Sequence, residues 1–127
     1  MRFIATDQAP KAIGPYSQAV EDGGLLFASG QIPLDPATGE LIAGDITASA
    51  ERILDNLEAV LQEAGLTFAD VLKTTVFLTQ TSDFPAMNAV YARRFGEHRP
   101  ARSTITVAGL PKGASLEIDL IARRGQR

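Results

Sequence analysis

The chain has 127 residues, the usual length of a single domain with one hydrophobic core. Apolar residues make up 45% and charged residues 21%, which is typical of a soluble globular protein. The net charge of −3 argues against nucleic acid as the main partner, because phosphate binding needs clustered Lys and Arg. The absence of cysteine excludes disulfides and thiol nucleophiles, and a single histidine excludes a His-rich metal site.

The sequence shows neither a targeting signal nor a membrane segment. Residues 1–6 carry one positive charge, but no long apolar run follows them. No stretch approaches the roughly 18 consecutive apolar residues of a membrane span. We therefore expect a cytoplasmic protein without a membrane partner, in which residues 1–127 form one α+β domain.

The first third of the chain predicts strands and loops. A short strand is expected over residues 2–6. Two further strands, over 16–20 and 25–29, are separated by two adjacent glycines, a pattern typical of a hairpin. Residues 34–44 are rich in proline and glycine, which indicates a loop.

The first predicted helix has the clearest pattern. Asp45 or Thr47 can cap its first turn, and Gly65 suits a left-handed end. Apolar residues recur at steps of three and four and so form one face. They are Ile46, Ala50, Ile53, Leu57, Val60, Leu61 and Ala64.

The remaining pattern predicts a strand, a second helix and two more strands. The strand covers 71–79, with Leu72 expected on the same side as Val76 and Leu78. The helix begins after Asp83 with Pro85 in its first turn. Its predicted buried stripe is Phe84, Met87, Val90, Tyr91 and Phe95. The last strands cover 103–107 and 115–122.

Two helices can cover only one face of a sheet of five or six mostly antiparallel strands. The other face would carry Phe77 and Ile121 beside Lys73, Glu117 and Asp119. Such a mixed surface often packs against another subunit, but it is also found on solvated antiparallel sheets. The pattern leaves both interpretations open.

Two charged residues stand where chemistry is conceivable. Arg102 opens a strand, and a guanidinium on a rigid strand end can hold a carboxylate through two parallel hydrogen bonds. Glu117 interrupts an apolar strand, and a carboxylate there could orient water and move its protons. Taken singly, each position is more commonly a solvent-exposed residue.

Five further positions are candidates either for a site or for ordinary structure. The Tyr16 hydroxyl could close a small pocket, or its ring could belong to the core. Ser29 and Gly30 end an apolar run, where glycine permits close approach of a ligand or marks a bulge. Asn88 is expected to face away from the buried stripe of the second helix. His98 lies among polar residues and is expected at the surface.

Taken together, these segments resemble the YjgF/RidA family of reactive intermediate deaminases. The resemblance runs in order along nearly the whole chain, which makes the set far more specific than any one motif. The matching segments are APKAIGPYSQA (9–19), ASGQIP (28–33), DF and MNAVY (83–84 and 87–91), PARST (100–104) and EI (117–118).

The resemblance implies a chorismate-mutase-like α+β fold, a relative of the ferredoxin-like fold, assembled as a homotrimer with active sites between subunits. It implies hydrolysis of 2-iminobutanoate and 2-iminopropanoate to 2-keto acids and ammonia, which protects pyridoxal-phosphate enzymes from enamine damage. The family uses neither a metal nor a cofactor.

The resemblance also implies roles for individual positions. Arg102 matches the arginine that binds the substrate carboxylate, and Glu117 matches the glutamate that positions the attacking water. Thr104 stands where the family often has Cys, and its backbone carbonyl is expected to help hold that water. Four residues match positions in or near the cleft: Tyr16, Ser29, Gly30 and Asn88.

Two rival functions stay open at this stage. The family also carries the labels translation inhibitor, endoribonuclease and chaperone-like protein, so a binding protein of the same fold is one alternative. The net charge of −3 and the single histidine give a ribonuclease little support. The other alternative is a paralogue that acts on a different imine or enamine.

Overall fold

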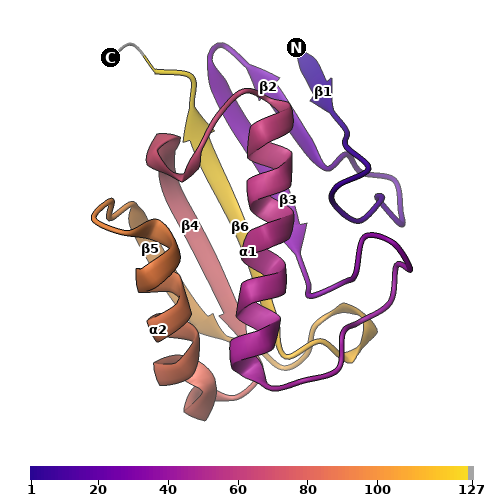
Figure 1. The fold of residues 1–127 in the computed structure, drawn as a ribbon, viewed down its shortest axis with the longest axis vertical. Helices are drawn as coiled ribbons and strands as arrows, with labels where there is room; N and C mark the ends of the chain where they lie inside the picture. Colours follow the sequence, from indigo (N-terminus) through magenta and orange to yellow (C-terminus); the bar gives the residue numbers. More distant parts are fainter. Residues whose placement is uncertain (126–127) are drawn as a thin grey trace.

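A computed structural model describes residues 1–125, which form two α-helices and six β-strands (Figure 1). In chain order the elements are β1 (Arg2–Ile4), β2 (Ala19–Asp22), β3 (Leu25–Gln31), α1 (Ile46–Glu63), β4 (Val71–Leu78), α2 (Phe84–Phe95), β5 (Ala101–Thr106) and β6 (Leu116–Arg123). Both helices lie on the same face of the sheet (Figure 1). The predicted α+β architecture, with two helices on one face of a six-stranded sheet, is confirmed.

The strand order in the sheet is β1-β2-β3-β6-β4-β5. All neighbouring strands are antiparallel except β4 and β5, which run parallel because α2 carries the chain back between them. Although β5 and β6 follow each other in the sequence, they do not pair. Instead β6 lies between β3 and β4, while β5 forms an edge. Arg102 therefore lies on an edge strand, and Glu117 lies on a central one.

Helix α1 supplies the largest share of the core. Asp45 caps it, since its Oδ1 accepts a hydrogen bond from the Ala48 amide at 3.0 Å, and Gly65 follows with φ of +78°. Burying each large aliphatic side chain contributes about 1.5–3 kcal/mol. The fully buried large aliphatic residues of α1 are Ile53, Leu54, Leu57, Val60 and Leu61.

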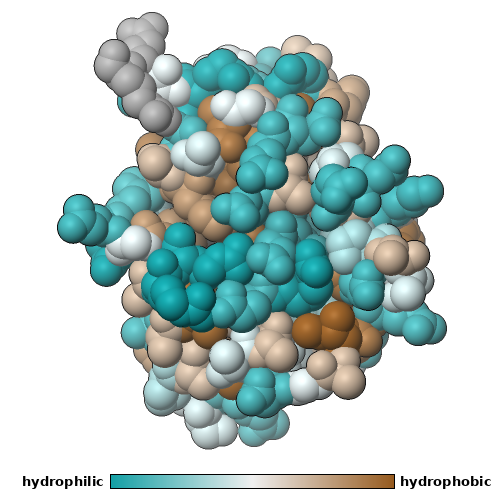
Figure 2. Space-filling model, viewed as in Figure 1, coloured by the Kyte–Doolittle hydropathy of each residue, from teal (hydrophilic) through white to brown (hydrophobic). Residues whose placement is uncertain are grey.

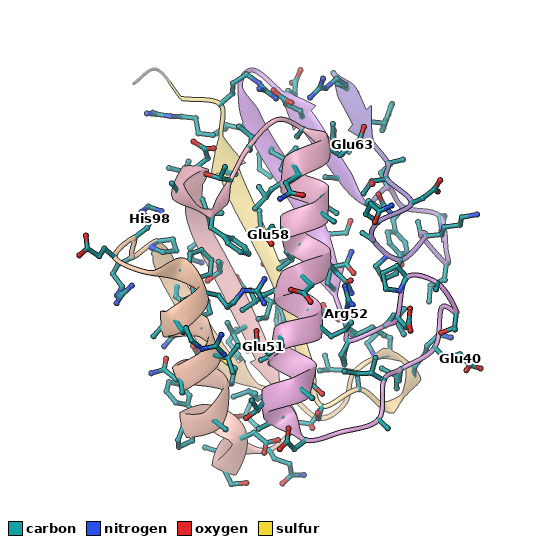
Figure 3. All side chains as sticks on the ribbon, viewed as in Figure 1. Glu40, Glu51, Arg52, Glu58, Glu63 and His98 are labelled. Atoms are coloured by element: carbon teal, nitrogen blue, oxygen red, sulfur yellow. The ribbon has the colours of Figure 1, made fainter. Side chains whose placement is uncertain are left out.

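A network of ion pairs joins the two helices. Arg94 of α2 contacts Glu51 at 2.8 Å, Asp55 at 2.9 Å and Glu58 at 3.6 Å, and Arg93 also pairs with Glu51. Glu51 and Glu58 lie on the side of α1 that faces α2 (Figure 3). Hydrophilic residues form a continuous band across the middle of this helical face (Figure 2).

Strand β2 begins three residues later than predicted. The predicted strand covers 16–20, whereas β2 starts at Ala19. Gln18 instead holds the N-terminal loop. Its Nε2 donates to the carbonyls of Pro10 at 2.8 Å and Thr6 at 3.0 Å, and its Oε1 accepts from the Thr6 amide at 2.7 Å. Its backbone carbonyl still accepts a hydrogen bond from the Ser29 amide of β3 at 2.9 Å, so Gln18 joins the loop to the sheet.

The prediction that Leu72 shares the buried side of β4 is wrong. A register shift between Val71 and Lys73 leaves Leu72 44% exposed, and Val71 and Thr74 become buried instead. Alternation alone cannot reveal such a bulge, because it depends on the pairing with β6.

The end of α2 differs from the prediction in a smaller way. β5 begins at Ala101 and not at residue 103. His98, expected at the surface, is half-buried, and its Nε2 lies 2.7 Å from the Val71 carbonyl oxygen. The histidine thus ties the turn after α2 to the start of β4.

The face of the sheet away from the helices carries a mixture of apolar and charged side chains. Phe27 and Ile105 are 47% and 44% exposed there, and Phe77, Ile121 and Glu117 are half-buried. The prediction of an uncovered face with this composition is confirmed. No helix within residues 1–125 is both long and apolar enough to cross a membrane.

Candidate active site

Arg102 projects from β5 toward α2. It pairs in register with Thr74 of β4, which is 1% exposed on the helical side of the sheet. Its Nη1 donates to Asn88 Oδ1 at 2.8 Å. Its guanidinium carbon lies 4.7 Å from the centroid of the Tyr91 ring and 5.6 Å from that of Phe84. Aromatic rings and an amide therefore orient this cation without neutralising it.

The lack of a carboxylate partner sets Arg102 apart from most arginines of the chain. Among residues 1–125, no Asp or Glu lies within ion-pair distance of its guanidinium. Five other arginines do have such partners: Arg2, Arg52, Arg93, Arg94 and Arg124. A half-buried guanidinium with free donors is suited to bind an anion from outside the chain.

A buried hydrogen bond to Thr74 of β4 fixes the position of Tyr91. Its hydroxyl lies 2.7 Å from Thr74 Oγ1, and the two residues are 6% and 1% exposed. Burial raises the pKa of the Tyr91 phenol, so the ring stays neutral under Arg102. The hollow above it has a volume of about 380 Å³. Its lining residues are Asn88, Tyr91, Ala92, Arg99, Pro100 and Arg102.

Glu117 lies on the opposite face of the sheet. Its neighbours Leu116 and Ile118 are fully buried under the helices, so Glu117 projects from the uncovered face, where it pairs with Phe77. Burial raises the pKa of its carboxyl, and the nearby Asp119 raises it further. A carboxyl whose pKa is shifted toward neutrality is a better proton shuttle than an ordinary surface glutamate.

The Glu117 side chain crosses directly over Gly30, so any larger residue at this position would displace it. A Cβ atom at position 30 would lie 2.8 Å from Cδ and 3.0 Å from Cγ of Glu117, and closer still to the Oε2 of that residue. The register of β3 also shifts here, between Ala28 and Gln31. The register shift supports the bulge interpretation of this glycine, and the group close to it is the Glu117 side chain; the approach of a ligand stays a prediction.

Tyr16 and Gly30 line a small hollow of about 60 Å³ together with Glu117. Tyr16 is 49% exposed, and its hydroxyl accepts a hydrogen bond from the Ile13 amide at 3.3 Å. Ser29 does not line this hollow. Its hydroxyl donates to the Ser17 carbonyl at 2.6 Å and so fastens the segment that carries Tyr16 to β3.

Within one chain, the predicted site residues thus form two separate groups. Arg102 and Asn88 meet on the helical side of the sheet, and Glu117, Gly30 and Tyr16 meet on the uncovered side. Thr104 pairs with Val76 on β5 and is half-buried, and it lines neither hollow. Among residues 1–125, no three His, Cys, Asp or Glu side chains are grouped to hold a metal ion.

Three residues that line these hollows are not predicted as site residues from the sequence. Tyr91 was assigned only to the core, although its ring carries Arg102. Arg99 and Lys11 were not singled out, yet Arg99 lines the hollow of Arg102 and Lys11 lines that of Glu117. Arg99 stands three residues before Arg102, so the sequence alone indicates that the two arginines lie close together.

The chain is similar to known proteins over nearly its full length. The family model described as Endoribonuclease L-PSP matches residues 6–124. The chain is 55% identical to Protein DfrA of Myxococcus xanthus over 95% of this chain and 94% of that protein. It is 49% identical to the 2-iminobutanoate/2-iminopropanoate deaminase of Escherichia coli K12, covering 97% of this chain and 98% of the enzyme.

Solved structures show the same fold. A crystal structure from Thermotoga maritima has a TM-score of 0.97 and 53% identity, covering 99% of each chain. Escherichia coli TdcF with bound serine has a TM-score of 0.94 and 46% identity, covering 98% of this chain and 100% of TdcF. The family match over nearly the full length, together with these relatives, shows that this chain belongs to the YjgF/RidA family.

Proposed function

We propose that this protein hydrolyses 2-imino acids, with 2-iminobutanoate and 2-iminopropanoate as substrates, to 2-keto acids and ammonia. The observation that carries the proposal is the half-buried, unneutralised guanidinium of Arg102 on its aromatic support. The name of the Escherichia coli relative at 49% identity supports the same reaction. The cellular benefit would be protection of pyridoxal-phosphate enzymes from the enamine tautomers.

Arg102 supplies the anchor for the substrate carboxylate. Asn88 occupies Nη1, which leaves the remaining N–H groups of the guanidinium for two parallel hydrogen bonds to a carboxylate. Holding the carboxylate fixes the imine carbon of so small a substrate. Such positioning converts a chance encounter with water into an oriented one.

Glu117 supplies the proton transfers. As a carboxylate it takes a proton from the water that attacks the imine carbon, and it returns a proton to nitrogen as the C–N bond breaks and ammonia leaves. Its raised pKa makes the carboxylate a stronger base toward that water. Tyr16 and Gly30 would bound the space of the water, and the Thr104 carbonyl would help to hold it.

A complete site then needs two copies of the chain, since Arg102 and Glu117 project from opposite faces of one sheet. We propose a homotrimer in which the Arg102 group of one subunit meets the Glu117 group of the next. The uncovered sheet face, with exposed Phe27 and Ile105, would be buried between subunits.

The test is ammonia release from a pyridoxal-phosphate dehydratase that acts on threonine or serine, with and without this protein. The proposed function predicts faster release of ammonia with the wild-type chain and no acceleration with Arg102→Gln. Equal rates with and without the wild-type protein would contradict it and would favour a binding protein of the same fold.

A further inference from the structure

The hollow that contains Arg102 holds a second guanidinium. Two of its lining residues are arginines, Arg99 and Arg102, and none is acidic. The others are an amide, a phenol, an alanine and a proline. This hollow therefore carries two positive charges, although the whole chain has a net charge of −3.

The Arg99 guanidinium binds the backbone through one of its three nitrogens. Its Nη1 donates to the carbonyls of Gly96 and His98, the latter at 3.0 Å, just beyond the end of α2. Across residues 1–125, no carboxylate forms an ion pair with it. A guanidinium has five N–H donors, so Nη2 and Nε remain available to a ligand in the hollow.

The charges of Arg102 and Arg99 both act on the pKa of the Tyr91 phenol. Burial is the main influence on its pKa and raises it, while the charges of Arg102 and, less strongly, Arg99 act in the opposite direction. The two guanidinium groups therefore lie within electrostatic reach of one buried hydroxyl. This agrees with their lining the same hollow.

A ligand with one carboxylate neutralises Arg102 and leaves Arg99 without an anion. A ligand with a second carboxylate on its side chain can satisfy both cations. We propose that the preferred substrates of this protein are dianionic imino acids, the imines of acidic amino acids, with Arg102 on the α-carboxylate and Arg99 on the distal one. This inference rests on the proposed function and places dianionic imino acids above the two small substrates named there.

The reaction itself is unchanged by this assignment. Water adds to the imine carbon, the C–N bond breaks, and the products are ammonia and a 2-oxo dicarboxylate. No oxidant or reductant is required. The products are stable acids, which makes them suitable probes of the two cations without competing hydrolysis.

The test is calorimetric titration of the assembled protein with 2-oxoglutarate and with 2-oxobutanoate. A charge-assisted hydrogen bond to a carboxylate strengthens binding, although an exposed arginine contributes less than a buried one. We therefore expect the wild type to bind 2-oxoglutarate about tenfold more tightly than 2-oxobutanoate. Arg99→Gln should remove that preference while changing 2-oxobutanoate binding less than twofold. The matched control Arg123→Gln, at an exposed arginine outside both hollows, should leave both affinities unchanged.

The outcomes separate this inference from the function on which it rests. If the wild type binds the two acids equally, or if Arg99→Gln weakens both equally or neither, then Arg99 is only a cap for α2 and the substrate class is wrong. If instead Arg102→Gln binds both acids as the wild type does, the proposed function itself fails.

Discussion

The contact between the two helices and the two hollows use the same residue types in opposite ways. Arg94 and Glu51 pair at 2.8 Å, and the pKa of Glu51 is lowered by its hydrogen bonds from Arg93 and Arg94. Arg102 and Glu117 project from opposite faces of the sheet, and burial raises the pKa of Glu117. One pair is neutralised within the chain, and the other is not.

The difference separates charges that hold the fold together from charges that are available to something else. An arginine with three carboxylates around it is already neutralised within the chain. An arginine that rests on aromatic rings keeps its charge and its donors. Exposure alone does not distinguish the two, because Arg94 and Arg102 are both half-buried.

The largest effect is expected from Arg102→Gln. Losing the bidentate anchor should lower kcat/KM for imine hydrolysis by about 100-fold or more, since charge-assisted pairs of this kind contribute several kcal/mol. The melting temperature should change little, because no ion pair within residues 1–125 is lost. Steady-state ammonia release and thermal unfolding of the same sample check both statements. A variant that is inactive only because it is unfolded would remove the contrast with Arg94.

The converse variant, Arg94→Met, should damage stability and spare the chemistry. It leaves Glu51 with Arg93 alone and removes from Asp55 and Glu58 the arginine nearest to them, and we expect a loss of about 1–2 kcal/mol in the free energy of unfolding. The lowered pKa of Glu51 means that its stabilisation is present above its ordinary value of 4.5 and is lost as pH falls through the lowered value. The difference from wild type in chemical denaturation should therefore shrink at low pH. A difference that grows on acidification would contradict this account.

Gly30→Ala tests the crossing of Glu117 over β3. The added methyl group occupies the place of the Glu117 carboxylate, which must swing away. Gly30 does not have a positive φ, so alanine does not strain the backbone there. We expect kcat to fall about tenfold with little change in KM, because Arg102 still binds the carboxylate. The matched control is Gly109→Ala, where a Cβ would meet no atom within 4 Å. An equal loss in the control would show that the effect is not specific to Glu117.

The smallest effect is the pH dependence of stability in Glu117→Gln. Folding raises the pKa of Glu117 above its ordinary value of 4.5. The protonated carboxyl therefore contributes stability below pH 4.5, and this contribution is lost as pH rises through the raised pKa. The neutral amide escapes that loss. Thermal unfolding should thus show a gain for the variant at pH 7 that disappears near pH 4, the opposite direction to that of Glu51. A variant destabilised equally at both pH values would contradict the assigned direction.

The sequence predicted the parts of this molecule that depend on local pattern. Both helices were located within a residue or two, because their apolar residues recur at the helical period and Asp45 and Gly65 mark the ends of α1. The alternation in β6 correctly placed Glu117 on the uncovered face. The family resemblance, which rests on ordered motifs, is confirmed by the match over residues 6–124.

The parts that depend on pairing between distant strands could not be predicted. The bulge that exposes Leu72 exists only in the register of β4 with β6. The face of Arg102 follows from its pairing with Thr74, which no local pattern reveals. The separation of Arg102 from Glu117 is therefore a finding of the structure, and it adds a physical reason for the site between subunits that the family resemblance implies.

The most direct test of that expectation is complementation between two inactive variants. Arg102→Gln and Glu117→Gln would be produced in the same cell, so that mixed oligomers form, and ammonia release would be compared with that of each variant alone. If one site takes Arg102 from one subunit and Glu117 from another, random mixing restores both groups in about a quarter of the sites. We predict activity near that fraction of wild type. Mixed oligomers as inactive as the separate variants would contradict the shared site.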